Sequence, residues 1–341
     1  MKKVMKKNSG IFTLLAAFIL TFALGLCGLT NAGQSAYAQT TWFDGVSVTL
    51  DENIKVNVNV TAPEGYTQAK ILFSLGVGTE IVTADVTDGS AVLTTGLVTP
   101  QYMNEKLVAE LTLSGEGKED ISEVNENFTL KAYLSSLLAE SAAGLKQTET
   151  ANALMRTLSV DLLNYGAEAQ KYVAAKSGTT VGTLANSDLT ADQAALATDF
   201  ETVAPQESDF SLGSGSTDVI DYKGAGLVFD YNVALYVNFV CEDVTGLIVK
   251  VTNDGNETII DEFTKIDDYY SFVYDRIAVV QFDNVLNIQA YKGETPVGRS
   301  LDYSVKSFVY SKKDSASVGA LSRATYVYGY SAAAFKNADM T

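Results

Sequence analysis

The chain contains no histidine among its 341 residues. Histidine activates the nucleophile in Ser-His-Asp and Cys-His enzymes, and it is also a common zinc ligand. Its absence excludes these kinds of chemistry. Hydrolysis by a pair of carboxylates remains as a catalytic alternative, but no motif supports it, so we expect a protein that is not an enzyme and has neither metal nor other cofactor.

Cysteine is almost as scarce, with Cys27 and Cys241 as the two examples. Cys27 lies in an N-terminal segment that we expect to be removed, which leaves no partner for a disulfide within the chain. The domains must then be held together by core burial alone. Cys241 ends the apolar alternation Val237, Phe239, Cys241, a pattern that predicts a buried small hydrophobic side chain.

The first 38 residues have the pattern of a signal peptide. Four lysines precede the apolar run Ile11 to Leu29, and Ala36-Tyr37-Ala38 supplies a cleavage site before Gln39. We therefore expect a secreted protein, extracellular or associated with the cell surface. The rival interpretation is an uncleaved anchor, because the run approaches the ~20 residues that span a bilayer. No other run does so, and the mature chain is predicted to have no membrane span.

Positive charge is also limited: 24 basic residues stand against 41 acidic ones, a formal net charge of −17. Loss of residues 1–38 removes four lysines and no acids, which brings the net charge near −21. Such a chain repels phosphate backbones, so nucleic acid is not an expected partner.

Strand patterns begin soon after Trp42. Apolar residues alternate with polar ones over 54–60, and further strand-like runs follow at 69–75, 81–86, 91–98 and 107–113. Asp88-Gly89 is predicted to form a hairpin turn between two of them. This pattern favours an antiparallel sheet or sandwich.

At Thr129 the apolar period becomes helical, with Thr129 or Asn127 as the N-cap. A longer helix is predicted from about Thr148 to Ala175. Gly166 interrupts its middle, where glycine costs about 1 kcal/mol against alanine. A close approach of another backbone or an aromatic ring would explain why a glycine occupies position 166.

Much of this pattern returns later in the chain, which predicts a tandem duplication. Three groups of matches carry it: Leu235, Val237 and Phe239 with Val56, Val58 and Val60; residues 304–309 with 129–134; and Tyr328-Gly329 with Tyr165-Gly166. Asn253-Asp254-Gly255-Asn256 marks a hairpin turn in the second copy. The predicted organisation is a signal peptide over 1–38, module 1 over 39–176, a linker over 177–218 and module 2 over 219–341.

The linker is rich in small and polar residues. Thr190 to Ala197 is predicted to form one short capped helix, and Ser211 to Thr217 a flexible connection.

Three motifs stand out in the first copy: Val98-Thr99-Pro100-Gln101-Tyr102-Met103, Thr129-Leu130-Lys131-x-Tyr133 and Leu162-Leu163-Asn164-Tyr165-Gly166-Ala167-x-Ala169-Gln170. Together they resemble a module of exported and cell-surface proteins from Gram-positive, clostridia-type bacteria. The linker segment Asp188 to Ala197 is similar to the one that often follows this module. The resemblance implies compartment and architecture, and it transfers no catalytic residue.

The best candidate for a binding surface is the aromatic cluster Tyr269, Tyr270, Phe272 and Tyr274, since 12 of the 18 tyrosines lie in the second copy. Aromatic faces suit stacking on sugars, and tyrosine suits protein interfaces equally. The alternative is that tyrosine only pairs across a sheet. The acidic pairs Asp261-Glu262 and Asp267-Asp268 are read as solvated turns rather than calcium ligands.

Two further features are interpreted as structural. The Tyr-Gly pairs are expected to pack helix on sheet, and Lys131 and Lys306, near helix starts where positive charge is unfavourable, are each expected to meet a paired charge in the same copy.

The predicted fold class is α+β, with two tandem homologous modules, each an antiparallel β-sandwich-like layer followed by a helical hairpin. The predicted function is non-catalytic adhesion to, or binding of, a glycan or a surface protein. A structural spacer or assembly subunit is the alternative.

Overall fold

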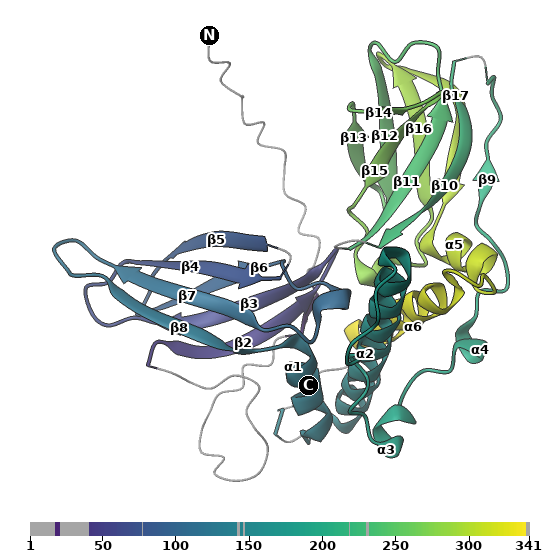
Figure 1. The fold of residues 1–341 in the computed structure, drawn as a ribbon. Coiled ribbons are helices and arrows are strands. Elements are labelled where there is room, and N and C mark those ends of the chain that lie inside the picture. The colour runs from purple at the N-terminus through teal and green to yellow at the C-terminus, as the bar shows by residue number, and fades with distance from the viewer. Residues whose placement is uncertain are drawn as a thin grey trace.

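The computed structural model describes residues 18–20, 41–76, 78–141, 144–145, 147–217, 219–229 and 232–338. It is a mixed α and β fold with four antiparallel sheets and six α-helices in that part of the chain. Two lobes of strands diverge from a group of helices that lies where they meet (Figure 1).

The first lobe contains two sheets. One has the order β1-β2-β3-β6, and the other β5-β4-β7-β8. Their strands are β1 Phe18–Leu20, β2 Phe43–Leu50, β3 Ile54–Thr61, β4 Gln68–Leu75, β5 Gly78–Asp85, β6 Ser90–Thr95, β7 Leu107–Ser114 and β8 Ile121–Phe128. The predicted alternation over 54–60 is confirmed, because Val56, Val58 and Val60 are buried while the residues between them are partly exposed.

The second lobe also contains two sheets. One sheet has the order β10-β11-β15-β14, and the other β13-β12-β16-β17-β9. Their strands are β9 Ser211–Leu212, β10 Asp221–Phe229, β11 Val233–Val240, β12 Leu247–Asn253, β13 Asn256–Ile260, β14 Thr264–Ile266, β15 Tyr269–Tyr274, β16 Leu286–Lys292 and β17 Thr295–Tyr303. Cys241 is buried beside β11, as predicted.

The two predicted hairpin turns have different outcomes. Asp254 and Gly255 have positive φ angles and join β12 to β13, which pair directly, so that hairpin is confirmed. Asp88 and Gly89 also have positive φ angles. Thr87 and Ser90 exchange two backbone hydrogen bonds across them, so the predicted turn is formed. However, β5 pairs with β4 and β6 with β3, so beyond this bridge the chain passes from one sheet to the other.

Two long helices and two shorter ones follow the strands. They are α1 Leu130–Ala139, α2 Glu149–Ser177, α5 Val305–Lys312 and α6 Gly319–Lys336. Thr129 caps α1 by accepting from the Ala132 amide, and Ser304 caps α5 in the same way through Ser307. Short 3-10 turns, η1 Pro100–Tyr102 and η2 Val279–Gln281, precede β7 and β16.

The linker is more structured than its composition predicts. It contains two short helices, α3 Ala191–Ala194 and α4 Phe200–Val203, where one was expected. Thr190 and Gln193 form the capping box of α3. Ser211 and Leu212, predicted to be flexible, pair as β9 with β17, and the Gly213 amide donates to the Ser300 carbonyl.

The predicted signal peptide lies outside the described residues except for β1, which pairs antiparallel with β2. None of the helices in the described ranges combines the length and apolar character needed to cross a bilayer.

Candidate functional site

The four aromatic residues singled out in the sequence do not share one exposed face. They alternate along β15, so Tyr270, Phe272 and Tyr274 point into the sandwich, where Tyr270 stacks on Phe239 with ring centroids 5.8 Å apart. Phe272 and Tyr274 are each only 4% exposed and belong to the core. Tyr269 points to the opposite, outer face of the sheet, and the prediction of a binding surface therefore rests on Tyr269 and its neighbours on that face.

The outer face of the β10-β11-β15-β14 sheet, here called the β11 face, carries side chains in rows across the strands. Directly paired residues share a face, and the pairing defines one row of Gly226, Tyr236 and Val273 and a next row of Gly224, Asn238, Ser271 and Thr264. Tyr269 and Ile266 pair in a third row, beside Val240 at the end of β11.

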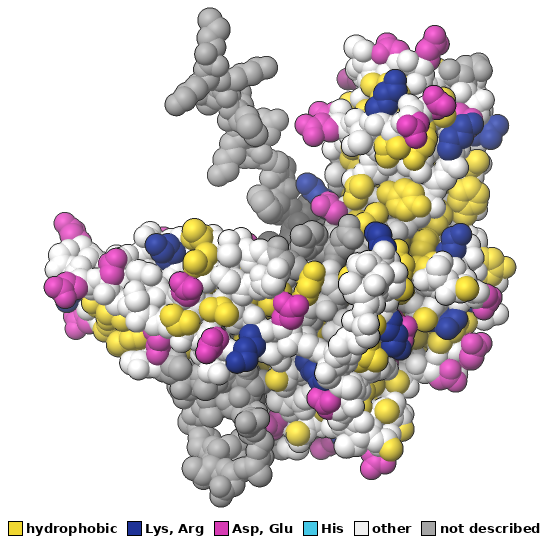
Figure 2. All heavy atoms as spheres, in the orientation of Figure 1, with side chains coloured by type: hydrophobic (Ala, Val, Ile, Leu, Met, Phe, Trp, Pro, Cys, Tyr) yellow, Lys and Arg dark blue, Asp and Glu magenta, His cyan; other side chains and the backbone are white. Residues whose placement is uncertain are grey.

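Apolar side chains dominate the first and third rows and remain open to solvent. Val273 is 54% exposed, while Val240 and Ile266 are each 38% exposed. Asp221, which pairs with Val240, adds a carboxylate to the third row, and it forms an ion pair with Lys223 on the same strand. Figure 2 shows hydrophobic side chains gathered over this part of the second lobe, with acidic and basic groups towards its end. Exposed aromatic and aliphatic groups on one sheet face are typical of a docking surface.

Tyr236 lies across its neighbour on β10. A Cβ placed on Gly226 would fall 2.6 Å from the Tyr236 hydroxyl and 2.7 Å from Cε1 and Cζ. The ring therefore rests over the glycine, and any larger residue at position 226 would displace it. Glycine at this pairing position thus allows an aromatic ring to lie along the sheet, a cross-strand arrangement known to compensate for glycine in strands.

The outer face of the β1-β2-β3-β6 sheet in the first lobe carries a polar network. Asn57, which the predicted duplication aligns with Tyr236, donates to Ser47 Oγ at 3.3 Å and Thr49 Oγ1 at 2.8 Å. It also accepts from Thr94 Oγ1 at 2.8 Å. These polar groups satisfy one another. On the described part of the β11 face, Asp221 and Lys223 form an ion pair at one edge, but no such network joins the strands.

The Tyr-Gly pairs lie in the joint between the lobes. Tyr165 on α2 and Tyr328 on α6 are buried and stack on each other, so they pack helix on helix rather than helix on sheet as predicted. The two glycines make equivalent contacts. A Cβ on Gly166 would fall 2.4 Å from Met103 Sδ, and one on Gly329 would fall 2.4 Å from Phe282 Cδ2.

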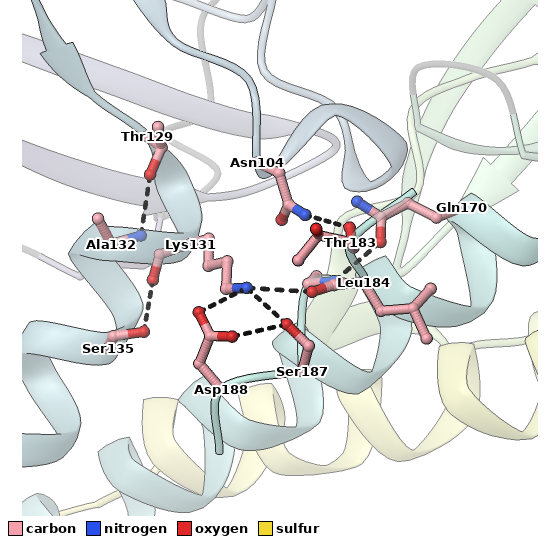
Figure 3. A network of polar contacts seen from close by, with 11 residues as sticks. Asn104, Thr129, Lys131, Ala132, Ser135, Gln170, Thr183, Leu184, Ser187 and Asp188 are labelled. Carbon is pink, nitrogen blue, oxygen red and sulfur yellow. Dashed lines mark hydrogen bonds and ion pairs between the residues drawn. The ribbon is translucent and has the colours of Figure 1, made fainter. Parts of the chain in front are cut away.

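Lys131 and Lys306 each meet an acid, but both partners lie in the linker rather than in the predicted copy. Lys131 Nζ lies 2.9 Å from Asp188 Oδ2 and donates to the Leu184 carbonyl and Ser187 Oγ, as Figure 3 shows. The hydrogen-bonded ion pair with Lys131, together with a hydrogen bond that Ser187 Oγ donates to the carboxylate, holds the pKa of the Asp188 carboxyl below its usual value.

Lys306 Nζ lies 3.3 Å from Asp209 Oδ1. Ser304 Oγ donates to the other oxygen of that carboxylate at 2.9 Å. The linker is therefore fastened near its start to α1 and near its end to α5.

A hollow of about 240 Å³ lies between α2, the linker and α6. Asp161 is buried beside it and accepts from the Thr198 amide and hydroxyl at 3.0 and 2.8 Å. Burial raises the pKa of Asp161 to about 6 against the opposing effect of these bonds. Asn164 and Glu168, which also line the hollow, are engaged by Asn186 and Lys171. These polar groups already have partners within the protein, so they stabilise the joint and are not available to a ligand.

The acidic pairs lie in exposed segments around β14, and Asp267 sits in a turn with positive φ. In the described ranges no group of three or more acidic or cysteine side chains has the arrangement of a metal site.

No model of a known protein family matches this chain. Comparison with curated proteins also gives no match. The site is therefore interpreted from its own geometry.

Proposed function

We propose that the chain is an exported, non-catalytic binding protein with a glycan or a surface protein as its ligand, and that the β11 face is its contact surface. One observation carries this proposal. A sheet face with exposed Val273 and partly exposed Tyr236 and Tyr269, whose carboxylate Asp221 is ion-paired with Lys223, lies on a chain whose net charge is −17. Proteins rarely leave aromatic and aliphatic groups together on a sheet face unless something covers them.

The proposal includes two homologous modules. The strand order supports it, since β2-β3-β6 corresponds to β10-β11-β15 and β5-β4-β7-β8 to β13-β12-β16-β17. Backbone contacts support it too. The Lys131 amide donates to the Met103 carbonyl, and the Lys306 amide donates to the Phe282 carbonyl, at equivalent places in each half.

The two modules have different tasks in this proposal. In module 1 the polar side chains of the outer face hydrogen-bond to Asn57. In module 2 the Tyr236 ring lies over Gly226 and is available to a ligand. Module 1 then supports module 2 and fixes its direction through the helical joint.

A spacer or assembly subunit is the second candidate, and the joint favours it. Stacked Tyr165 and Tyr328, together with the fastened linker, hold the lobes at one angle, as a spacer requires.

The test uses the exported chain, whose N-terminus is expected at Gln39 by sequencing. Wild type and a Tyr236→Ala, Val273→Ala double variant are compared on a glycan array and on a panel of bacterial and host surface proteins. Binding that the double variant loses supports the proposal. Ile81→Ala, with its side chain 67% exposed on the first lobe, is the control.

Wild type that binds nothing, or a double variant that binds equally well, overturns the proposal. Ordered self-assembly at high concentration would support the spacer instead.

A further inference from the structure

We propose that the β11 face binds an uncharged polysaccharide chain, with the Tyr236 and Tyr269 rings packing on sugar units and Asn238 bonding to hydroxyl groups between them. This inference rests on the proposed binding function and names the class of ligand.

The Tyr236 ring supplies the first half of the argument. Because it lies over Gly226, one side of the ring rests on the sheet, and the side chain remains partly exposed. The C–H face of a sugar ring is flat and apolar, and it packs on an aromatic ring presented in this way. An edge-on tyrosine would suit a hydrogen bond better than such a contact.

The spacing of the rows supplies the second half. Tyr236 pairs with Val273, and Tyr269 lies four residues before Val273 on β15. Strand geometry therefore places the two tyrosines about 13 Å apart along the sheet. The row between them contains Asn238 and Thr264. Two ring platforms with hydrogen-bonding groups between them suit a chain of several sugar units, whose apolar faces and hydroxyl groups alternate.

Charge decides which polysaccharides fit. The carboxylate in these rows, Asp221, is neutralised by its ion pair with Lys223, and the chain as a whole is strongly acidic. An anionic polymer would meet no unpaired cation in the three rows and would be repelled by the surrounding acids. An uncharged polymer meets neither difficulty, and its binding should change little with salt.

The face also contains aliphatic groups, which would serve a protein partner. A hydrophobic protein interface would use Val273, which is 54% exposed, at least as much as Tyr236. A polysaccharide would depend on the tyrosine rings and much less on the valine. The two ligands therefore predict opposite rankings of the same substitutions.

The experiment measures retention of the full exported chain on cellulose, β-1,3-glucan, xylan and starch, with polygalacturonate as the anionic control. Wild type should bind at least one neutral polymer and not polygalacturonate. Tyr236→Ala and Tyr269→Ala should each weaken binding roughly tenfold or more. Tyr236→Phe keeps the ring and should stay within about threefold of wild type, and Asn238→Ala should lose roughly threefold or more.

Two controls keep the result specific. Gly226→Val removes the space that the Tyr236 ring occupies and should weaken binding without any change to the tyrosine itself. Ile81→Ala, far away on the first lobe, should bind like wild type, and circular dichroism should confirm that each variant is folded.

Failure of every neutral polymer, or equal binding by Tyr236→Ala, overturns the inference. If the face instead captures a protein and Val273→Ala costs as much as Tyr236→Ala, the polysaccharide is wrong while the binding function stands. If neither class of ligand depends on the face, both are wrong.

Discussion

Tyr165 and Tyr328 stack across the joint between the lobes, with ring centroids 5.3 Å apart and planes 13° from parallel. The predicted duplication aligns these two residues, and their stack joins α2 to α6. Stacked aromatic pairs add about 0.5–1.5 kcal/mol to the contribution of burial. This pair therefore anchors the angle between the lobes.

Truncation of one ring should test that role. Tyr328→Ala is expected to lower the free energy of unfolding by about 3–5 kcal/mol, because it removes a buried ring and leaves a cavity beside Tyr165. Urea unfolding measures the loss. Tyr330→Ala on the same helix, where the side chain is 48% exposed, should cost less than about 1 kcal/mol. Equal costs for the two variants would contradict the anchoring role.

Replacement of either helix glycine, Gly166 or Gly329, with alanine should lower the stability of the protein. Gly329→Ala places a Cβ 2.4 Å from Phe282 Cδ2, and Gly166→Ala places one 2.4 Å from Met103 Sδ. Overpacking costs about 1–3 kcal/mol and should outweigh the helix propensity that alanine gains. Gly182→Ala has open space around it and serves as the control in thermal unfolding. A stabilised Gly329→Ala protein would show that the contact relaxes freely.

Lys131 should protect the linker from proteases. Its side chain is only 12% exposed, and it ties the linker to α1 through Asp188 and the Leu184 carbonyl. Lys131→Ala should destabilise the chain by about 1–3 kcal/mol and speed proteolytic cleavage within 177–198. Lys171→Ala removes an exposed lysine paired along α2 and should leave the cleavage rate unchanged. Unchanged cleavage in Lys131→Ala would show that other contacts hold the linker.

Asp161 should make stability depend on pH. Burial raises its folded pKa to about 6, above the ordinary aspartate value of 3.8, so the folded state holds the proton more tightly. The stabilisation is complete below about pH 3.8 and is lost as the pH rises through 6, by about 3 kcal/mol at most.

Asp161→Asn should remove this contribution. The difference in unfolding free energy between wild type and variant, followed from pH 4 to pH 8, should shift in favour of the variant as the pH rises. A constant difference would mean that the pKa of Asp161 is not raised. Thr198→Val, which keeps the carboxyl but removes one donor, should preserve the pH dependence.

Local features of the fold could be predicted from the residues alone. The alternation at Val56, Val58 and Val60 specified a strand with one buried face, and Thr129 specified the start of α1. The Asp254-Gly255 hairpin followed from φ angles that glycine and aspartate tolerate. Each of these depends on neighbours within a few residues, so sequence was sufficient.

Pairing between distant segments could not be read in the same way. Asp88-Gly89 forms a turn like that at Asp254-Gly255, yet its two strands join different sheets because the sandwich closes between them. The lysine partners Asp188 and Asp209 lie 57 and 97 residues away from Lys131 and Lys306. Long-range ion pairs leave no periodic signal in a single sequence.

The candidate site shows the same division. The sequence by itself determined that aromatic residues concentrate in the second half and that β15 alternates. Only the tertiary structure decided that Tyr269 faces outward while Phe272 and Tyr274 fill the core, and that Tyr236 from another strand joins the outer face over Gly226. The reason is physical: a strand has two faces of equal pattern, and the sheet that packs against one of them decides which side chains remain for a ligand.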